Sequence, residues 1–192
     1  MIKVLNNLIP LTAQNRWKQM STDRDFRWYY KSDITYHPNA GFPDFYTMER
    51  TCGYSRSVFF EGELDTPELM PWCQQILDGM TEQTGIKVEK LIRIQVNMLC
   101  QNPSKTFTAD SWNAAHTDQN YDHKVLLYYI NNSDGDTFLF DQKYGEQFDA
   151  FTIKQRVTPT QGTAVLFDGN HFHASSNPIN TYKRYAINFN FV

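Results

Sequence analysis

The sequence predicts a mainly β fold of the sandwich, barrel or jelly-roll type. From Lys90 onward, apolar and polar residues alternate with the period of two that strands require. Turn-forming stretches, among them Asn131–Asp136 and Pro159–Gly162, separate these segments. Many short strands joined by turns are typical of such folds. We therefore expect one domain, residues 1–192, in which residues 1–90 form a helical and mixed support region and residues 91–192 the β core.

Composition narrows the class of protein. Hydrophobic residues make up 41% and charged residues 20% of the 192 residues, which indicates a globular chain rather than a disordered one. The net charge of −3 and the absence of a basic run argue against a nucleic-acid partner. They do not exclude a local basic patch on the folded surface. No signal peptide or membrane span is apparent, so we expect a cytoplasmic protein that does not bind membranes.

Cysteine usage agrees with that location. The three cysteines are Cys52, Cys73 and Cys100, and no two of them form a CxxC pair. A zinc ribbon or a thioredoxin-like site is therefore not expected, and a reducing compartment is the natural interpretation.

The first region contains one clear helix, predicted over residues 67–84. Its apolar residues recur at helical spacing, with Thr66 as the expected N-cap and Gly85 as the C-terminal stop. A helix over Leu11–Met20 has a weaker pattern. Short strands are expected at Phe26–Tyr30 and Val58–Phe60, and a loop at Pro38–Phe45.

The second region is predicted to consist of strands. One of them has two distinct faces, because Ile94, Val96 and Met98 alternate with polar residues. The opposite face carries Arg93, Gln95, Asn97 and Leu99, and such polarity is unusual for the middle of a core. The expected strands are Ile92–Cys100, Ala114–Asp118, Lys124–Ile130, Thr137–Phe140, Phe151–Val157, Thr163–Phe167 and Arg184–Phe191.

The tripeptide His116-Thr117-Asp118 is a candidate metal site. In a strand, residues i and i+2 point to the same face, so the imidazole and the carboxylate could reach one ion. Alone the tripeptide is weak support, since a His and an Asp on a solvated strand face look the same. A third ligand from a distant strand, His171 or His173, would complete the facial set of two His and one carboxylate that non-haem iron(II) oxygenases use.

Arg184 follows these histidines at the start of the last predicted strand. An arginine fork binds a carboxylate through two parallel hydrogen bonds, which a dicarboxylic co-substrate beside an open iron site would need. Taken alone, Arg184 would more commonly be an exposed charge at a strand end.

In this order, His116-x-Asp118, His173 and Arg184 resemble the motif of the 2-oxoglutarate/Fe(II)-dependent dioxygenases. The similarity is greatest to the prolyl 4-hydroxylase-like branch, which includes small phage-encoded members, and covers roughly residues 90–192. Tyr128-Tyr129-Ile130-Asn131 resembles the Tyr-Tyr-Leu-Asn stretch of prolyl hydroxylases. Gly135-Asp136-Thr137 sits where that branch has Gly-Gly-Glu-Thr, with Asp134 in place of the first Gly. The segment 162–167 resembles the strand before the distal His of the family.

The resemblance implies a double-stranded β-helix (jelly roll, cupin-like) with N-terminal helices packed on the larger sheet. It implies Fe(II) bound by His116, Asp118 and His173, and 2-oxoglutarate and dioxygen as co-substrates. Arg184 and Tyr129 would bind the distal carboxylate of 2-oxoglutarate. Asn97 would contact the iron-chelating end, unless it is a buried amide satisfied by the backbone.

The implied reaction is hydroxylation of a C–H bond with decarboxylation of 2-oxoglutarate to succinate. A prolyl or other peptidyl substrate is the natural expectation, and a small molecule is equally open. The loop Gln101–Trp112 and the segment Phe26–Tyr30 could line the substrate entrance, with a core role favoured for the second. Two alternatives are a jelly-roll binding module without a functional metal and a cupin-like metalloenzyme that does not use 2-oxoglutarate.

The remaining histidines are assigned by their surroundings. His171 and His173 share a face if their segment is extended, so spacing does not decide between them. The small residues Ala-Ser-Ser after His173 match the family, which favours His173 as the ligand. His171 would then lie beside the site or on the surface, and His123 and His37 in a loop and on the surface.

Overall fold

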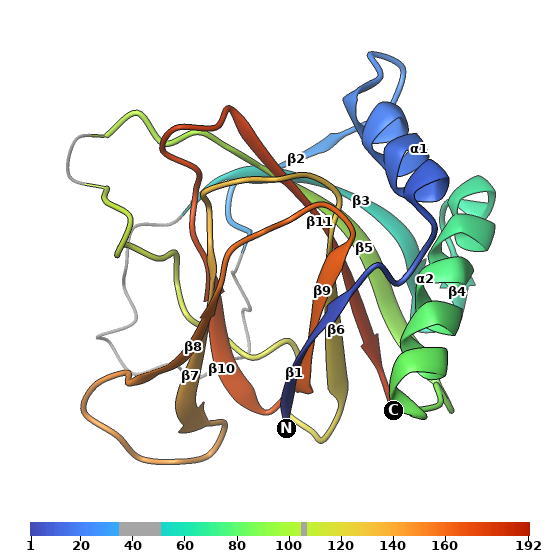
Figure 1. Cartoon of the computed structure of the whole chain (residues 1–192). Helices are drawn as coiled ribbons and strands as arrows, with labels where there is room; N and C mark the ends of the chain where they lie inside the picture. Colours follow the sequence, from blue (N-terminus) through green and yellow to red (C-terminus); the bar gives the residue numbers. More distant parts are fainter. Residues whose placement is uncertain (35–50, 105–106) are drawn as a thin grey trace.

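The computed structural model describes residues 1–34, 51–104 and 107–192. Its strands lie in two antiparallel sheets, and two α-helices cover one of them (Figure 1). The helices are α1 (Leu11–Thr22) and α2 (Met70–Thr84), and a 3-10 turn, Pro67–Leu69, leads into α2. The strands are β1 (Ile2–Asn6), β2 (Tyr29–Lys31), β3 (Gly53–Phe60), β4 (Glu63–Leu64), β5 (Leu91–Cys100), β6 (Lys124–Tyr129), β7 (Thr137–Lys143), β8 (Ile153–Val157), β9 (Thr163–Asp168), β10 (His171–Ser175) and β11 (Lys183–Phe191).

The larger sheet has the order β1-β9-β6-β11-β5-β3-β2, with β4 paired to β3. The smaller sheet has the order β10-β7-β8 and faces the larger one (Figure 1). Strands from both halves of the chain therefore build the larger sheet, while the smaller sheet comes from the C-terminal half. The two sheets do not close into a barrel in the described part of the chain. The mainly β, two-sheet architecture predicted from the sequence is confirmed.

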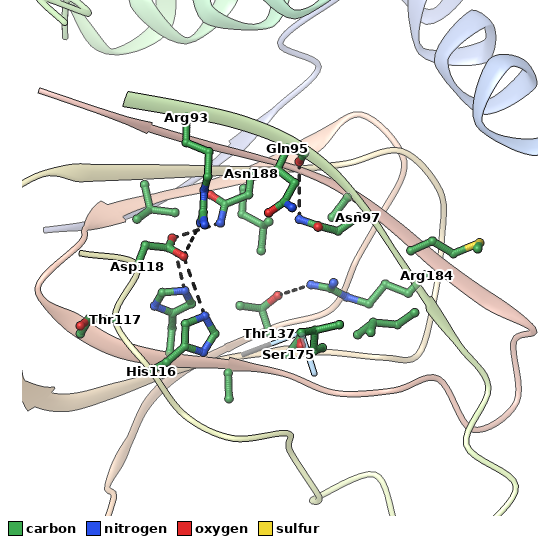
Figure 2. Close-up of a pocket in the computed structure, with 18 of the residues that line it drawn as sticks. Arg93, Gln95, Asn97, His116, Thr117, Asp118, Thr137, Ser175, Arg184 and Asn188 are labelled. Atoms are coloured by element: carbon green, nitrogen blue, oxygen red, sulfur yellow. Dashed lines mark hydrogen bonds and ion pairs between the residues drawn. The ribbon is translucent and has the colours of Figure 1, made fainter. Parts of the chain in front are cut away.

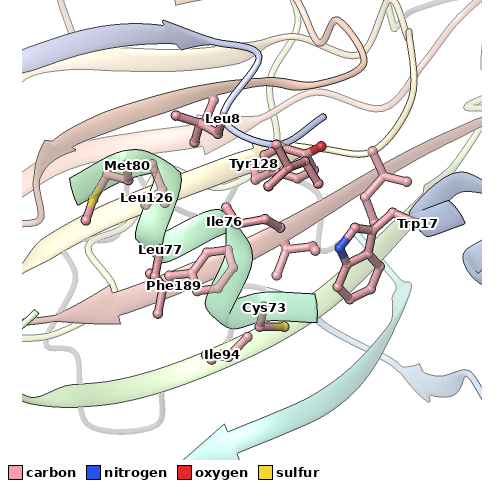
Figure 3. Packing of buried hydrophobic residues seen from close by; sticks show 14 of the residues in the cluster. Leu8, Trp17, Cys73, Ile76, Leu77, Met80, Ile94, Leu126, Tyr128 and Phe189 are labelled. Atoms are coloured by element: carbon pink, nitrogen blue, oxygen red, sulfur yellow. The ribbon is translucent and has the colours of Figure 1, made fainter. Parts of the chain in front are cut away.

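The main core lies between the helices and the outer face of the larger sheet (Figure 3). In α2, the residues Cys73, Ile76, Leu77 and Met80 are buried against the sheet. Trp17 from α1 is fully buried in the same cluster. Each fully buried large apolar side chain contributes roughly 1.5–3 kcal/mol to folding. The helices thus cover the outer face of the larger sheet, and residues of its inner face line the cavity between the sheets.

The ends of α2 partly follow the sequence signals. Gly85 ends the helix with φ 73°, in the left-handed region, and its N–H donates to the Thr81 carbonyl at 2.8 Å. Thr66 occupies the predicted N-cap position, before the 3-10 turn that leads into α2, but its side chain makes no capping hydrogen bond. Its hydroxyl donates instead to the backbone carbonyl of Ser57 at 2.7 Å. That bond ties the start of the helical segment to β3.

The two-faced pattern of β5 is confirmed. Ile94 and Val96 are fully buried in the core under the helices, together with Met98. The opposite face of β5 lines a cavity between the sheets, with Arg93, Gln95, Asn97 and Leu99. The polar face thus belongs to the inner surface that carries the candidate site.

Residues 114–118 do not form the predicted strand. Only His116 makes a bridge, in which its N–H and carbonyl exchange 2.9 Å hydrogen bonds with His173. The chain bends at Asp118, so pairing stops after one residue. The sequence pattern offered no means of predicting this early end, because it depends on the path of β10.

Other boundaries also differ from the expectations. The predicted strand Phe26–Tyr30 is shifted to Tyr29–Lys31, and Phe26 packs on the core instead. β1 and β10 were not expected, since both are five-residue strands without a clear alternation. The loop Pro38–Phe45 and His37 lie outside the described residues, as do Lys105 and Thr106 of the Gln101–Trp112 loop.

Two further findings concern the cysteines and the helices. Cys52, Cys73 and Cys100 are all free thiols. Among the helices that the structure describes, none has the length and apolar character needed to cross a bilayer.

Candidate metal and co-substrate site

A cavity of about 150 Å³ lies between the two sheets (Figure 2). The inner face of the larger sheet supplies one wall through β5, β6 and β11. The opposite wall comes from the smaller sheet, with residues of β7 and β10, and from the segment 116–118. Polar side chains dominate this lining, including Arg93, Gln95, Asn97, His116, Asp118, Thr137, His173, Arg184 and Asn188.

His116, Asp118 and His173 converge at one end of this cavity. One ligand atom from each residue lies within 4.8 Å of the others. The His116 Nε2 atom is 3.9 Å from Asp118 Oδ1, and the His173 Nε2 atom is 3.8 Å from Asp118 Oδ2. Although the segment of His116 is not a regular strand, its single bridge to His173 places the two imidazoles side by side, with ring centroids 4.6 Å apart.

Both imidazoles are oriented by backbone carbonyls. His116 Nδ1 lies 3.1 Å from the carbonyl of Ala114, and His173 Nδ1 lies 3.3 Å from that of His171. A carbonyl can only accept, so each Nδ1 carries the hydrogen and each Nε2 keeps its lone pair. This tautomer is the one a metal requires from both rings.

Asp118 is held by three donors. Arg93 Nη2 donates to Oδ1 at 2.6 Å, while the side-chain amides of Asn188 and Asn190 donate to Oδ2 at 3.0 and 2.8 Å. Oδ2 therefore has both lone pairs occupied, whereas Oδ1 keeps one for a metal ion. Burial favours a raised pKa for Asp118, but the positive charge of Arg93, the neighbouring imidazoles of His173 and His116 and the Asn188 hydrogen bond outweigh it. They hold its pKa well below the usual range.

Arg93, Asn188 and Asn190 were not predicted as site residues. The sequence nevertheless places them on the polar face of a strand. Asn188 and Asn190 alternate with apolar residues in β11, as Arg93 does in β5. Asn190 faces Arg93 across the β5–β11 ladder, and its Oδ1 accepts from Arg93 Nε at 2.8 Å. Only strand pairing shows that all three meet Asp118.

The structure brings His173, and not His171, together with His116 and Asp118. A register shift occurs between the two histidines where β10 pairs with β7. His171 is buried, and its Nδ1 lies 3.0 Å from the Phe140 carbonyl, on the smaller sheet. Burial lowers the pKa of His173 to about 3, and the neighbouring His116 contributes to this lowering. His173 is therefore neutral and able to bind a metal at ordinary pH.

His123 lies in the loop before β6, as expected, but it is not exposed there. Its side chain is buried, and Nδ1 lies 2.8 Å from the Tyr121 carbonyl. A Cβ built on Gly169 would lie 2.1 Å from His123 Nε2, so only a glycine leaves room for this ring. His123 is not part of the three-ligand group.

Arg184 lies at the other end of the cavity. It is buried, and its Nη2 donates to Thr137 Oγ1 at 2.8 Å (Figure 2). Its Nε, also buried, has no hydrogen-bond partner among the residues that the structure describes. Burial lowers the pKa of Arg184, while the neighbouring Tyr129 and Asp136 favour its charged form. A buried guanidinium with an unused donor fits a carboxylate ligand.

Tyr129 lies behind this end, where its ring centroid is 5.6 Å from Arg184 Cζ. The Tyr129 hydroxyl donates to Thr137 Oγ1 at 2.9 Å, and burial raises the pKa of Tyr129 to about 12. Thr137 lines the cavity, whereas Tyr129 is packed behind it. Sequence reasoning singled out Tyr129 and missed Thr137, although Thr137 follows directly in the Gly-Asp-Thr motif.

Asn97 lines the cavity on β5. Its side-chain amide nitrogen lies 3.5 Å from the Gln95 carbonyl oxygen, longer than the roughly 2.7–3.2 Å of an ordinary N–H···O hydrogen bond. The backbone therefore offers the Asn97 amide only a weak hydrogen bond, which gives little support to the alternative that it is a buried amide satisfied by the backbone.

The donor set fits a divalent ion together with a dicarboxylate. Two neutral imidazoles and one carboxylate with open positions beside them suit Fe(II). The unused donor of Arg184 lies in the same cavity, where it could bind the remote carboxylate of a ligand that also binds the metal. The residues present therefore fit both iron and 2-oxoglutarate.

No protein-family model and no curated protein matches this sequence. Solved structures do match over the whole chain. A prolyl hydroxylase from Trichoplax adhaerens, in complex with a hypoxia inducible factor peptide fragment, has a TM-score of 0.63 and 12% identity, covering 99% of this chain and 82% of that one. A 2OG-Fe(II) oxygenase family oxidoreductase from Burkholderia pseudomallei has a TM-score of 0.64 and 13% identity, covering 99% and 84%.

A third match is to a structure that contains both cofactors. The epimerase SnoN, in complex with Fe3+, alpha ketoglutarate and nogalamycin RO, has a TM-score of 0.56 and 9% identity, covering 100% of this chain and 78% of that one. Identities this low establish the fold alone. The chain therefore has the double-stranded β-helix fold of these 2-oxoglutarate and Fe(II) enzymes, as its sequence predicted.

Proposed function

We propose that this chain is a 2-oxoglutarate- and Fe(II)-dependent dioxygenase that hydroxylates a C–H bond. The observation that carries the proposal is the pairing of two features in one cavity. His116, Asp118 and His173 converge at one end, and the buried guanidinium of Arg184 lies at the other. Each feature alone also occurs in proteins of different classes, but their combination suits a ligand that chelates a metal and ends in a carboxylate.

His116, Asp118 and His173 would hold Fe(II) on one face of its coordination sphere. Arg93, Asn188 and Asn190 keep Asp118 ionised and fixed, so the carboxylate needs no rearrangement on binding. Arg184 and Thr137 would bind the distal carboxylate of 2-oxoglutarate, with Tyr129 orienting Thr137 and Asn97 near the keto acid end. When bound, these cofactors supply oxidation of the substrate by dioxygen, with release of succinate and carbon dioxide.

The alternatives leave part of the site without a role. A jelly-roll binding module would not need two imidazoles whose tautomers are set for a metal beside a buried carboxylate. A cupin-like metalloenzyme that does not use 2-oxoglutarate would not need a buried arginine with an unused donor. Burying such a charge is costly unless a ligand pairs with it.

A peptidyl or prolyl substrate is supported by the peptide in the Trichoplax adhaerens structure. We also propose that residues 1–192 act as one oxygenase domain, since strands from both halves build the larger sheet. A cytoplasmic location and a relationship to small phage-encoded enzymes are part of the same proposal.

Anaerobic titration tests the function directly. The protein with Fe(II) should develop a visible charge-transfer band when 2-oxoglutarate is added. Exposure to air should then convert 2-oxoglutarate to succinate. His116→Ala should abolish both signals. A protein that binds Fe(II) but shows neither the band nor succinate formation would contradict the proposal.

A further inference from the structure

The metal end of the cavity is open to solvent on one side. The side chains of Asp118 and His173 are only 4% and 7% exposed, whereas those of Arg93 and His116 are 21% and 20% exposed. Solvent therefore reaches the three ligands past Arg93 and His116. A substrate whose C–H bond must come near the metal would enter along this side.

Arg93 is fixed in place but not fully used. Its Nη2 donates to Asp118 Oδ1 at 2.6 Å, and its Nε donates to Asn190 Oδ1 at 2.8 Å. These two bonds orient the planar guanidinium, which lies beside Asp118 in Figure 2. Its Nη1 has no hydrogen-bond partner in the described part of the chain. The two N–H groups of Nη1 are thus left, with fixed orientation, at the edge of the metal site.

The charges in the cavity do not balance without a further anion. Its charged lining residues, apart from the histidines, are Arg93, Asp118 and Arg184. Iron(II) and Arg184 together bring three positive charges, and Asp118 and 2-oxoglutarate bring three negative ones. With Arg93 the cavity then carries a net charge of +1, and Arg93 is the cation beside the metal. In a shielded cavity, such a charge favours a ligand with one negative charge.

Resting on the proposed function, we propose that Arg93 anchors the substrate and that the substrate carries a carboxylate. Nη1 of Arg93 would pair with this carboxylate while the C–H bond faces the metal. A carboxylate brings the single negative charge that the cavity lacks, whereas a phosphate monoester brings roughly two at neutral pH. The carboxylate can belong to a small acid or to an acidic peptide.

The first experiment uses acetate as probe and acetamide as its neutral control. The protein is loaded with 2-oxoglutarate and with Mn(II), which is paramagnetic. Mn(II) shortens the proton relaxation times of small molecules that bind beside it. Acetate should be relaxed strongly and acetamide weakly. Arg93→Gln should weaken acetate binding about tenfold or more, because a charge-assisted hydrogen bond is lost. Equal relaxation of the two probes in the unmodified protein would overturn the proposal.

Two further variants separate anchoring from support of Asp118. Asn188→Ala also removes one hydrogen bond to Asp118 but keeps the charge of Arg93. The Asn188→Ala protein should therefore still bind acetate more strongly than acetamide. Arg93→Lys keeps the charge and should restore part of the preference. All variants are compared at equal Mn(II) occupancy. An acetate preference that survives in Arg93→Gln would contradict the proposal.

The same samples separate this proposal from the proposed function. Failure of 2-oxoglutarate to bind the Mn(II) protein would reject the function before acetate is added. A second assay measures 2-oxoglutarate consumption with small carboxylic acids and their amides, and with peptides containing Asp or Glu and their Asn or Gln counterparts. Stimulation by acids of either source supports the proposal and identifies that source. Equal stimulation by the neutral counterparts would reject it.

Discussion

Thr137 Oγ1 accepts a hydrogen bond from Arg184 Nη2 at 2.8 Å. The same oxygen accepts from the Tyr129 hydroxyl at 2.9 Å. With both lone pairs occupied, the Thr137 hydroxyl hydrogen remains free to donate into the cavity that Thr137 lines. Thr137 thus links the fully buried Tyr129 to the arginine and presents a third donor to a carboxylate.

Replacing Thr137 tests this link. Thr137→Val keeps the shape of the side chain but removes the hydroxyl, so we expect 2-oxoglutarate to bind about tenfold more weakly. Metal affinity should not change, because Thr137 contacts none of the three metal ligands. The measurement is a 2-oxoglutarate titration of the Mn(II)-loaded protein. Thr137→Ser, which keeps the hydroxyl, should bind nearly as the unmodified protein does. Unchanged affinity in Thr137→Val would show that the hydroxyl does not contact the ligand.

The two histidines of β10 should respond differently to substitution. His173→Ala removes a proposed metal ligand, so its loss of metal affinity should exceed the roughly 10–100-fold typical of residues that only support a ligand. His171→Ala should keep metal affinity within about tenfold of the original and lower the free energy of unfolding by about 2 kcal/mol, because its buried bond to Phe140 is lost. Mn(II) titration and urea unfolding of both variants measure the two effects. The reverse pattern would assign the metal to His171.

Asp134 ties the loop before β11 to the turn after β6. Its carboxylate accepts from the backbone N–H groups of Ile179, Asn180 and Thr181 and from the Thr181 hydroxyl. This gives a structural role to the Asp that replaces a glycine of the family motif. Burial favours a raised pKa for Asp134, but the Thr181 and Asn180 hydrogen bonds lower it far below the usual value.

Asp134→Asn should therefore lower the free energy of unfolding by about 2 kcal/mol at pH 7. A carboxyl with a lowered folded-state pKa stabilises the protein above its unfolded pKa of about 3.9, and this stabilisation is lost as the pH falls further. The gap between the two proteins should accordingly shrink below about pH 4. Urea unfolding at a series of pH values measures it. A gap independent of pH would mean that the charge of Asp134 does not contribute.

Gly79 sets how closely α2 approaches the segment after β1. A Cβ built on Gly79 would lie 1.9 Å from the backbone carbonyl oxygen of Leu8. In an exposed helix, Gly→Ala stabilises by about 1 kcal/mol, but here we expect Gly79→Ala to destabilise by about 1–3 kcal/mol. Gln75→Ala, at an exposed position of α2, is the matched control and should be nearly neutral. Stabilisation by Gly79→Ala would show that Leu8 moves without cost.

The sequence by itself determined the parts of this protein that depend on local pattern. Period-two alternation predicted most strands of the β core, and the apolar stripe with Gly85 predicted α2. The two faces of β5 followed from the same alternation, so the cavity-lining role of Arg93, Gln95 and Asn97 could be expected. The order of His116-x-Asp118, His173 and Arg184 along the chain, with its resemblance to a known motif, suggested a metal and a dicarboxylate.

Only the tertiary structure decided which side chains meet. The register shift between His171 and His173 selects one of two histidines that a simple alternation makes equivalent. The three donors to Asp118 come from β5 and β11, and only their pairing across the sheet brings Arg93 and Asn190 to the same carboxylate. The cause is the same in each case. Contacts between distant segments depend on strand register and on where pairing stops, and neither is written in local periodicity.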